Sequence, residues 1–192
     1  MILLCLLIPI IGISQNKNVV SATRLFPKVD KVLEFEKALA AHSQKYHSGD
    51  YKWRVFEVQS GPDAGAYHIT EGPFSWEGLD TRGNLGNEHN IDWNKNVAVH
   101  LTDRSTSSYS VYQESISSVQ ITDYSDKINI THYFPKPGWG PPFRAELAKF
   151  KKVWDASGES IAVYTASSSG PAQYSVVQRY KQGLKERQAD FR

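Results

Sequence analysis

Apolar side chains recur along the chain with two periods, and each period predicts one type of element. Steps of four, three and four residues place side chains on one face of a helix. Two stretches, residues 29–46 and 142–157, follow these steps with the members Phe35, Leu39, His42 and Tyr46 in the first and Phe143, Leu147, Phe150 and Trp154 in the second. Runs rich in β-branched and aromatic residues flank both stretches. They predict strands at residues 18–26, 51–58, 66–70, 127–134, 159–166 and 173–180.

The same order of elements occurs in both halves of the chain, which indicates an internal duplication. Two tripeptides recur in the same order, Phe-Pro-Lys at 26–28 and 134–136 and Ser-Gly-Pro at 60–62 and 169–171. Their offsets of 108 and 109 residues agree with the offset of 108 between the two helical stripes. Each half therefore predicts a strand, a helix, a strand, a hairpin turn and a strand. Short hairpins make the second and third strands antiparallel, and the helical crossover suits a split βαβ arrangement.

The connection between the halves, residues 72–123, has weaker patterns. Trp93 and Val97 follow helical spacing and predict one helix that ends near residue 101. The serine-rich residues 105–118 predict a loop or a weak helix. A last helix is predicted at residues 181–192.

The first fourteen residues contain no charged side chain and consist mostly of Ile and Leu. The run is shorter than the roughly 20 residues that span a bilayer, so no stable membrane span is expected. It matches the apolar core of a secretory signal with a cleavage position near Ser14, which predicts an exported protein, periplasmic or extracellular. A buried N-terminal strand is the alternative. The expected organisation is a signal peptide at 1–14, a first unit with its following helix at 18–101, a linker at 102–123 and a second unit at 124–192.

Composition excludes several classes of protein. Lys and Arg number 22 against 20 Asp and Glu, so the net charge of +2 argues against nucleic acid as a partner. Met1 and Cys5 are the single Met and the single Cys, and both lie in the expected signal. A mature chain without them has no thiol for a disulfide, a nucleophile or a Cys-ligated metal. The sequence also lacks a glycine-rich phosphate loop and the nucleophile elbow of hydrolases, and no cofactor is expected.

The two strand–helix–strand–strand units resemble the dimeric α+β barrel superfamily. That superfamily includes antibiotic-biosynthesis-type monooxygenases that use no cofactor, haem-degrading enzymes and small-ligand-binding proteins. The resemblance implies an α+β fold in which two ferredoxin-like units pack their sheets into a barrel, here as a fused pseudo-dimer within one chain. It covers nearly the whole mature chain and rests on topology and the repeat. The haem-degrading members place an Asn, a Trp and a His around the haem, and no motif of this chain matches that set.

The resemblance implies a small hydrophobic or aromatic ligand as partner and, for an enzyme, a cofactor-independent oxygenation or isomerisation. The alternative is a non-catalytic structural or interaction module of the cell envelope. Ligand pockets usually exceed about 300 Å³, so a filled and dry barrel would favour the alternative. The pattern indicates no particular oligomeric state.

Three histidines are candidate proton-handling residues because each interrupts an apolar stripe. His42 has the apolar Phe150 as its repeat partner, His68 lies in the middle of a predicted strand, and His132 has Arg24 as its repeat partner. For each histidine the alternative is a structural or solvent-facing position.

Three further residues are candidates for binding the ligand. Arg24 lies on the first predicted strand, and Tyr133 and Trp139 belong to an aromatic, proline-rich stretch at residues 133–143. Aromatic side chains in such a loop can form a platform for a flat ligand or a sugar ring. The alternative is a stiff loop that leads into the following helix, with Pro142 in its first turn.

The six histidines do not predict a metal site. None belongs to an H-x-x-x-H or H-E-x-x-H pair, which is the helical spacing that brings two imidazoles to one ion. His42 and His47 are five residues apart, so on a continuous helix they would point to different faces. We therefore expect no metal ligands.

Overall fold

The computed structural model describes residues 16–82 and 85–188. The expected signal peptide at 1–14 and the end of the expected helix at 181–192 lie outside these ranges. In the part of the chain that is described, no helix is both long and apolar enough to cross a membrane.

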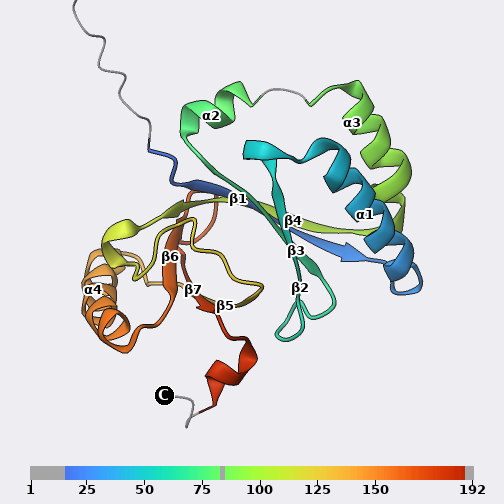
Figure 1. Ribbon diagram of the computed structural model, residues 1–192. Helices are drawn as coiled ribbons and strands as arrows, with labels where there is room; N and C mark the ends of the chain where they lie inside the picture. The colour runs from blue at the N-terminus through green and yellow to red at the C-terminus, as the bar shows by residue number, and fades with distance from the viewer. Residues whose placement is uncertain (1–15, 83–84, 189–192) are drawn as a thin grey trace, which may run out of the picture.

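Seven strands, all paired antiparallel, form one curled sheet in the order β2-β3-β1-β4-β6-β7-β5 (Figure 1). The sheet curves into a half-barrel, and four α-helices complete an α+β fold. The strands are β1 Val19–Pro27, β2 Trp53–Glu57, β3 Tyr67–Phe74, β4 Leu101–Tyr112, β5 Lys127–Tyr133, β6 Ile161–Ala166 and β7 Tyr174–Tyr180. The helices are α1 Val32–Tyr46, α2 Trp76–Thr81, α3 Asn87–Asp92 and α4 Gly140–Ser157.

The first four strands have the order of a split βαβ unit, β4-β1-β3-β2. Helix α1 connects β1 to β2, and α2 and α3 lie between β3 and β4. The later elements β5, α4, β6 and β7 follow the chain order of β1, α1, β2 and β3, and their strands lie in the sheet as β6-β7-β5. We call β1 to β4 with their helices the first set, and β5, α4, β6 and β7 the second set. The two sets meet where β4 pairs with β6 over Ser110↔Ala166, Val111↔Thr165 and Tyr112↔Tyr164.

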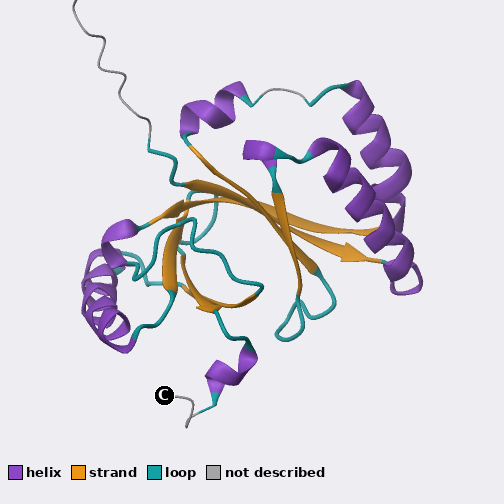
Figure 2. Ribbon diagram, viewed as in Figure 1, coloured by secondary structure: helices purple, strands orange, loops and turns teal. Residues whose placement is uncertain are grey.

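Helices α1, α3 and α4 lie on the outer, convex side of the curled sheet (Figure 2). Two hydrophobic clusters fill the space beneath them. The cluster under α1 consists of Leu25, Phe35, Leu39, Tyr67, Ile69 and Val97. The cluster under α4 consists of Ile116, Leu147, Ile161 and Val163.

Strand alternation directs the remaining side chains to the concave side. Successive residues of a strand point to opposite faces of the sheet. In β3, Ile69 packs under α1, whereas its neighbours His68 and Thr70 line the concave face. In β6, Val163 packs under α4, whereas Tyr164 lines the concave face. The period-2 pattern of the sequence thus separates a helix-covered core from a second, more polar face.

All six predicted strands and both long predicted helices are present, but the prediction for residues 105–118 is wrong. Most of this serine-rich stretch belongs to β4, which pairs with β1 along its length and with β6 at its end. Small hydroxyl side chains occur there because β4 lies under the hollow of the half-barrel, where Thr106, Ser108 and Ser110 line a cavity. The expected linker at 102–123 therefore begins with a central strand.

Three other predictions need correction. The helix expected around Trp93 begins at Asn87 as α3 and continues through a π turn and a 3-10 turn to His100. Beyond residue 180, the described chain contains one short 3-10 helix, Leu184–Arg187, which follows Gly183 at a φ of 88°. Phe150 is 54% exposed and stacks on Trp154, because only Leu147 of this stripe faces the sheet squarely enough to be fully buried.

Candidate functional site

The concave face of the sheet holds a cavity of about 350 Å³. This volume is in the range of pockets that bind small molecules. Side chains from β1, β2, β5 and β7 form its apolar wall, namely Val20, Ala22, Phe56, Ile128, Ile130 and Val177. Polar and charged groups gather in two places along this wall.

The first polar group joins Arg24, Asp63, His68 and His132. The Arg24 guanidinium donates to Asp63 Oδ2 at 3.1 Å and lies 3.5 Å from His68 Nδ1. Arg104 donates to the other Asp63 oxygen at 2.7 Å. His132 Nδ1 accepts from Gln173 Nε2 at 2.8 Å and lies 2.9 Å from Ser175 Oγ.

Both imidazoles in this group are kept neutral by their surroundings. Burial in the cavity and the positive charge of Arg24 lower the pKa of His68 to about 4, and protonation of the neighbouring His132 would lower it further. Burial and the Arg24 charge also lower the pKa of His132, with Asp63 acting in the opposite direction. Because an arginine or amide nitrogen faces Nδ1 of each ring as a donor, the ring proton lies on Nε2. Each ring can therefore donate a hydrogen bond to a ligand.

The second polar group contains Arg54, Tyr124, Tyr164 and Arg179. The Arg54 guanidinium stacks on the Tyr124 ring at 3.3 Å from its centroid and donates to the Gly72 carbonyl. Arg179 is only 4% exposed and donates to Tyr164 Oη at 3.0 Å. Burial raises the pKa of the Tyr164 phenol, so it stays protonated as a hydrogen-bond donor.

Arg179 also fixes the irregular segment that follows the 3-10 helix Glu114–Ile116. Its guanidinium donates to the backbone carbonyls of Gln120, Ile121 and Asp123. The Asp123 carboxylate is occupied by Lys181 and by the Ser160 hydroxyl. Tyr124 at the end of this segment reaches Arg54 on the edge strand β2, so the segment bridges the open side of the half-barrel.

Three of the residues expected from the sequence meet in this cavity. Arg24, His68 and His132 all line it, and Arg24 contributes to the pKa of both histidines. Two expected residues lie elsewhere. Tyr133 is 42% exposed and packs on Phe143, and Trp139 is 62% exposed at the start of α4. The aromatic loop leads into α4, and both side chains lie outside the cavity.

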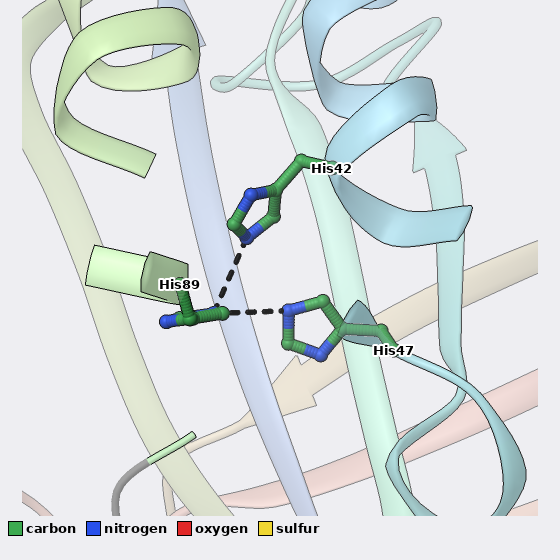
Figure 3. Close-up of side chains that lie close together, drawn as sticks. All are labelled: His42, His47 and His89. Carbon is green, nitrogen blue, oxygen red and sulfur yellow. Dashed lines mark hydrogen bonds between the residues drawn. The ribbon is translucent and has the colours of Figure 1, made fainter. Parts of the chain in front are cut away.

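His42 lies on the opposite side of the sheet from the cavity. It is 1% exposed beneath α1, where its ring approaches those of His47 and His89 (Figure 3). The expectation that His42 and His47 point apart is wrong. Helix α1 ends at Tyr46, and His47 has left the helical conformation with φ −117° and ψ 72°, so its ring turns back toward His42. In the described chain, His42, His47 and His89 are the residues grouped closely enough to hold a metal ion.

The second polar group of the cavity was missed by the sequence interpretation. Arg54 alternates with Trp53 and Val55 in a predicted strand, and Arg179 stands at the end of another. A charged residue at a strand position whose neighbours are apolar is the available signal. The contact of both with Tyr124 depends on the path of an irregular segment, which local patterns do not encode.

Comparisons with known proteins point to the fold. No protein-family model and no curated protein matches the chain. Solved structures do match across most of it. A protein from Lactobacillus acidophilus NCFM, provisionally described as a monooxygenase, superimposes with a TM-score of 0.58 at 11% identity, covering 86% of this chain and 78% of that one.

Two further solved structures are similar. One from Fusobacterium nucleatum, also provisionally described as a monooxygenase, has a TM-score of 0.54 at 12% identity over 84% of this chain and 75% of that one. An anthrone oxidase-like protein has a TM-score of 0.53 at 14% identity over 90% of this chain and 76% of that one. At these identities the likeness shows a shared α+β fold with a curled antiparallel sheet.

Proposed function

We propose that the protein binds a small, flat, aromatic molecule carrying a carbonyl or phenolic oxygen, and that it oxygenates this molecule without a cofactor. The observation that carries the proposal is the 350 Å³ concave cavity, in which apolar walls separate two groups of cationic and hydrogen-bonding side chains. An aromatic ring buries its faces against the apolar walls. The oxygen of the ligand accepts hydrogen bonds from the arginine and imidazole donors.

The two histidines have different roles in this proposal. His68 lies against Arg24 and has a pKa of about 4, so it stays neutral and donates its Nε2 proton to the ligand oxygen. With Arg24 it stabilises negative charge that develops on that oxygen. His132 lies at the exposed rim, where its Nδ1 lone pair accepts from Gln173 and lies close to the Ser175 hydroxyl. In this proposal the Gln173 amide moves away when the ligand binds, and the freed Nδ1 lone pair takes a proton from the ligand and passes it to solvent.

The chemistry needs a ligand with a weakly acidic C–H next to a carbonyl. Removal of the proton leaves an electron-rich enolate, which reacts with molecular oxygen. For anthrone the balance is one CH₂ group plus one O₂, which gives one new carbonyl group and one water, with oxygen as the oxidant. The anthrone oxidase-like neighbour supports anthrone as the first molecule to test.

The test is to titrate the full chain with anthrone by isothermal calorimetry and to follow anthraquinone formation and oxygen consumption. We expect one ligand per chain and equal molar amounts of oxygen consumed and quinone formed. In His132→Gln the turnover number falls by about 100-fold or more with little change in affinity. In Arg24→Gln the affinity itself falls, because a ligand contact is lost. His100→Gln, outside the cavity, is the matched control.

The alternative, a non-catalytic structural module, makes the opposite prediction. The purified protein would show its bare sequence mass in native mass spectrometry. It would also bind neither anthrone nor other flat aromatic molecules, and that combination would refute the ligand-binding proposal. Binding without oxygen consumption would refute the oxygenation step alone and leave a carrier or sensor.

We also propose that the two sets of elements arose by duplication of one ferredoxin-like unit. Three observations support this origin: the repeated chain order, the shared tripeptides and their positions. Phe-Pro-Lys lies at the end of the first strand in the first set and directly after it in the second, and Ser-Gly-Pro lies in each hairpin. The first set has β4 as its fourth strand.

A further inference from the structure

We infer that His42, His47 and His89 bind one divalent transition-metal ion of the zinc class on the convex side of the sheet. The three imidazoles come from three segments: α1, the turn that follows it, and α3. His89 Nε2 lies 3.2 Å from His42 Nε2 and 3.3 Å from His47 Nε2. The ligand nitrogens of all three lie within 4.8 Å of one another.

These separations match those of metal ligands. Zinc binds imidazole nitrogen at about 2.0–2.1 Å, and in a tetrahedral site two such nitrogens are about 3.3 Å apart. The two Nε2 separations agree with this value. Three histidines leave one tetrahedral position, and the partial exposure of His89 allows water to reach it.

The outward-facing nitrogens support the same assignment. Histidines that bind metals donate their other ring proton to an oxygen, which fixes the ring and leaves the second nitrogen free for the ion. His42 Nδ1 donates to Asp92 Oδ2 at 2.6 Å, and His89 Nδ1 lies 3.1 Å from Asn90 Oδ1. His47 Nδ1 faces Glu71 Oε1 at 3.7 Å. The Asp92 carboxylate adds a negative charge beside the site, whereas the Glu71 carboxylate is shared with the Arg82 guanidinium at 2.8 Å.

Hydrogen bonds alone account poorly for the arrangement. With the Nδ1 proton of His42 committed to Asp92, its Nε2 presents a lone pair to His89. His89 Nε2 carries at most one proton, so it can donate to only one of its two neighbours, His42 Nε2 and His47 Nε2. His47 Nδ1 is buried and points at the Glu71 carboxylate, which at 3.7 Å is beyond hydrogen-bond distance, so no hydrogen bond from the described residues fixes this nitrogen. A cation placed between the three Nε2 atoms would satisfy all of the lone pairs at once.

Aromatic side chains enclose the cluster and limit the competition from water. Trp53 stacks on His47 with ring centroids 3.5 Å apart, and Trp93 meets His42 edge-on at 5.4 Å. A bound ion in this position would hold the end of α1 against α3, on the far side of the sheet from the cavity. The inference therefore concerns stability and does not depend on the proposed oxygenation.

The test uses the full chain, produced without a polyhistidine tag and stripped of metal with a chelator. Zn²⁺ titrated by calorimetry should bind at one ion per chain, and Co²⁺ should give the visible absorption bands of a tetrahedral nitrogen site. At a hundredfold excess over Kd, Zn²⁺ should raise the Tm by about 5–10 °C.

Three variants make the test specific. His89→Asn removes the most exposed ligand, so it should fold and lose both the one-to-one binding and the rise in Tm. Asp92→Asn should lower the affinity by about 10–100-fold while keeping the stoichiometry. His100→Gln should behave as the wild type does. The inference is overturned if Zn²⁺ leaves the Tm of the wild type unchanged. That result would mean that shared protons, and no metal ion, hold the three imidazoles together. The inference is equally overturned if His89→Asn binds Zn²⁺ as tightly as the wild type.

Discussion

His68 links the chemistry of the cavity to the pH dependence of folding. Its pKa is about 4 in the folded chain, against an ordinary value of 6.5, because burial and the positive charge of Arg24 disfavour the imidazolium. Between these two values the unfolded chain binds a proton that the folded chain does not. Stability is therefore complete above about pH 6.5 and is lost progressively as the pH falls toward 4.

This shift predicts a difference between the wild type and His68→Gln. From pH 7 to pH 5, the free energy of unfolding of the wild type should fall by about 1–2 kcal/mol more than that of the variant. Urea unfolding at the two pH values measures it. Equal losses in the two proteins would show that His68 takes up its proton as easily in the folded state as in the unfolded one.

The regularity of strands and helices explains which histidines the sequence could place. His68 and His132 were singled out because each interrupts an apolar strand pattern, and Arg24 was noted as the repeat partner of His132. All three line the cavity, because strand geometry is regular enough for alternation to give the face. His42 and His47 were misjudged because the spacing rule assumes a helix that continues through both. The chain leaves the helix at His47, and no local signal specifies the direction it then takes.

Among the elements, the segment between the 3-10 helix Glu114–Ile116 and β5 has more backbone carbonyls bound by Arg179 than by any other side chain. Arg179 from β7 donates to three of its backbone carbonyls from a position that is 4% exposed. Removal of this guanidinium takes the donor away from three partly buried carbonyl oxygens.

Arg179→Met should therefore lower the free energy of unfolding by about 2–4 kcal/mol. It should also make the chain more sensitive to chymotrypsin after Tyr124. Arg104→Met is the matched control, because the Arg104 side chain is 59% exposed and contacts the Asp63 carboxylate and the Phe26 ring rather than this segment. If the two variants unfold and are cleaved alike, Arg179 does not anchor the segment.

Strand β4 shows where element prediction fails for a physical reason. Central strands are usually recognised by apolar residues, because both faces are covered. The inner face of β4 borders the cavity, where Thr106, Ser108 and Ser110 lie, and residues 102–107 are exposed, so neither face of this part of the strand requires apolar side chains. A serine-rich sequence can thus form a central strand when a hollow lies above it, and only the tertiary fold reveals the hollow.

At the scale of the whole molecule, the halves share one sheet and one cavity. Side chains of β1, β2 and β3 and side chains of β5, β6 and β7 line the same hollow, and β4 pairs with β6 across the junction. Neither half can expose its inner face without affecting the other. The chain should therefore unfold in a single cooperative transition.

A reporter confined to the first half tests this. Replacing Trp139 and Trp154 by Phe leaves Trp fluorescence from the first half only. Adding Leu147→Ala, a cavity in the core of the second half, should cost about 2–5 kcal/mol and shift the fluorescence and circular dichroism midpoints equally. Val153→Ala on the exposed face of α4, where Val153 is 60% exposed, should shift neither. A fluorescence midpoint that stays in place while the circular dichroism midpoint moves would reveal two independent units.

The two faces of strand β3 limit the insertions and deletions that this strand can tolerate during evolution. His68 and Thr70 border the cavity, while Ile69 lies in the core under α1 and Glu71 faces His47. Inserting or deleting a single residue within β3 would exchange the two faces and displace both sites at once. Descendants of this chain can therefore replace side chains along β3 one at a time, but they must keep its residue count.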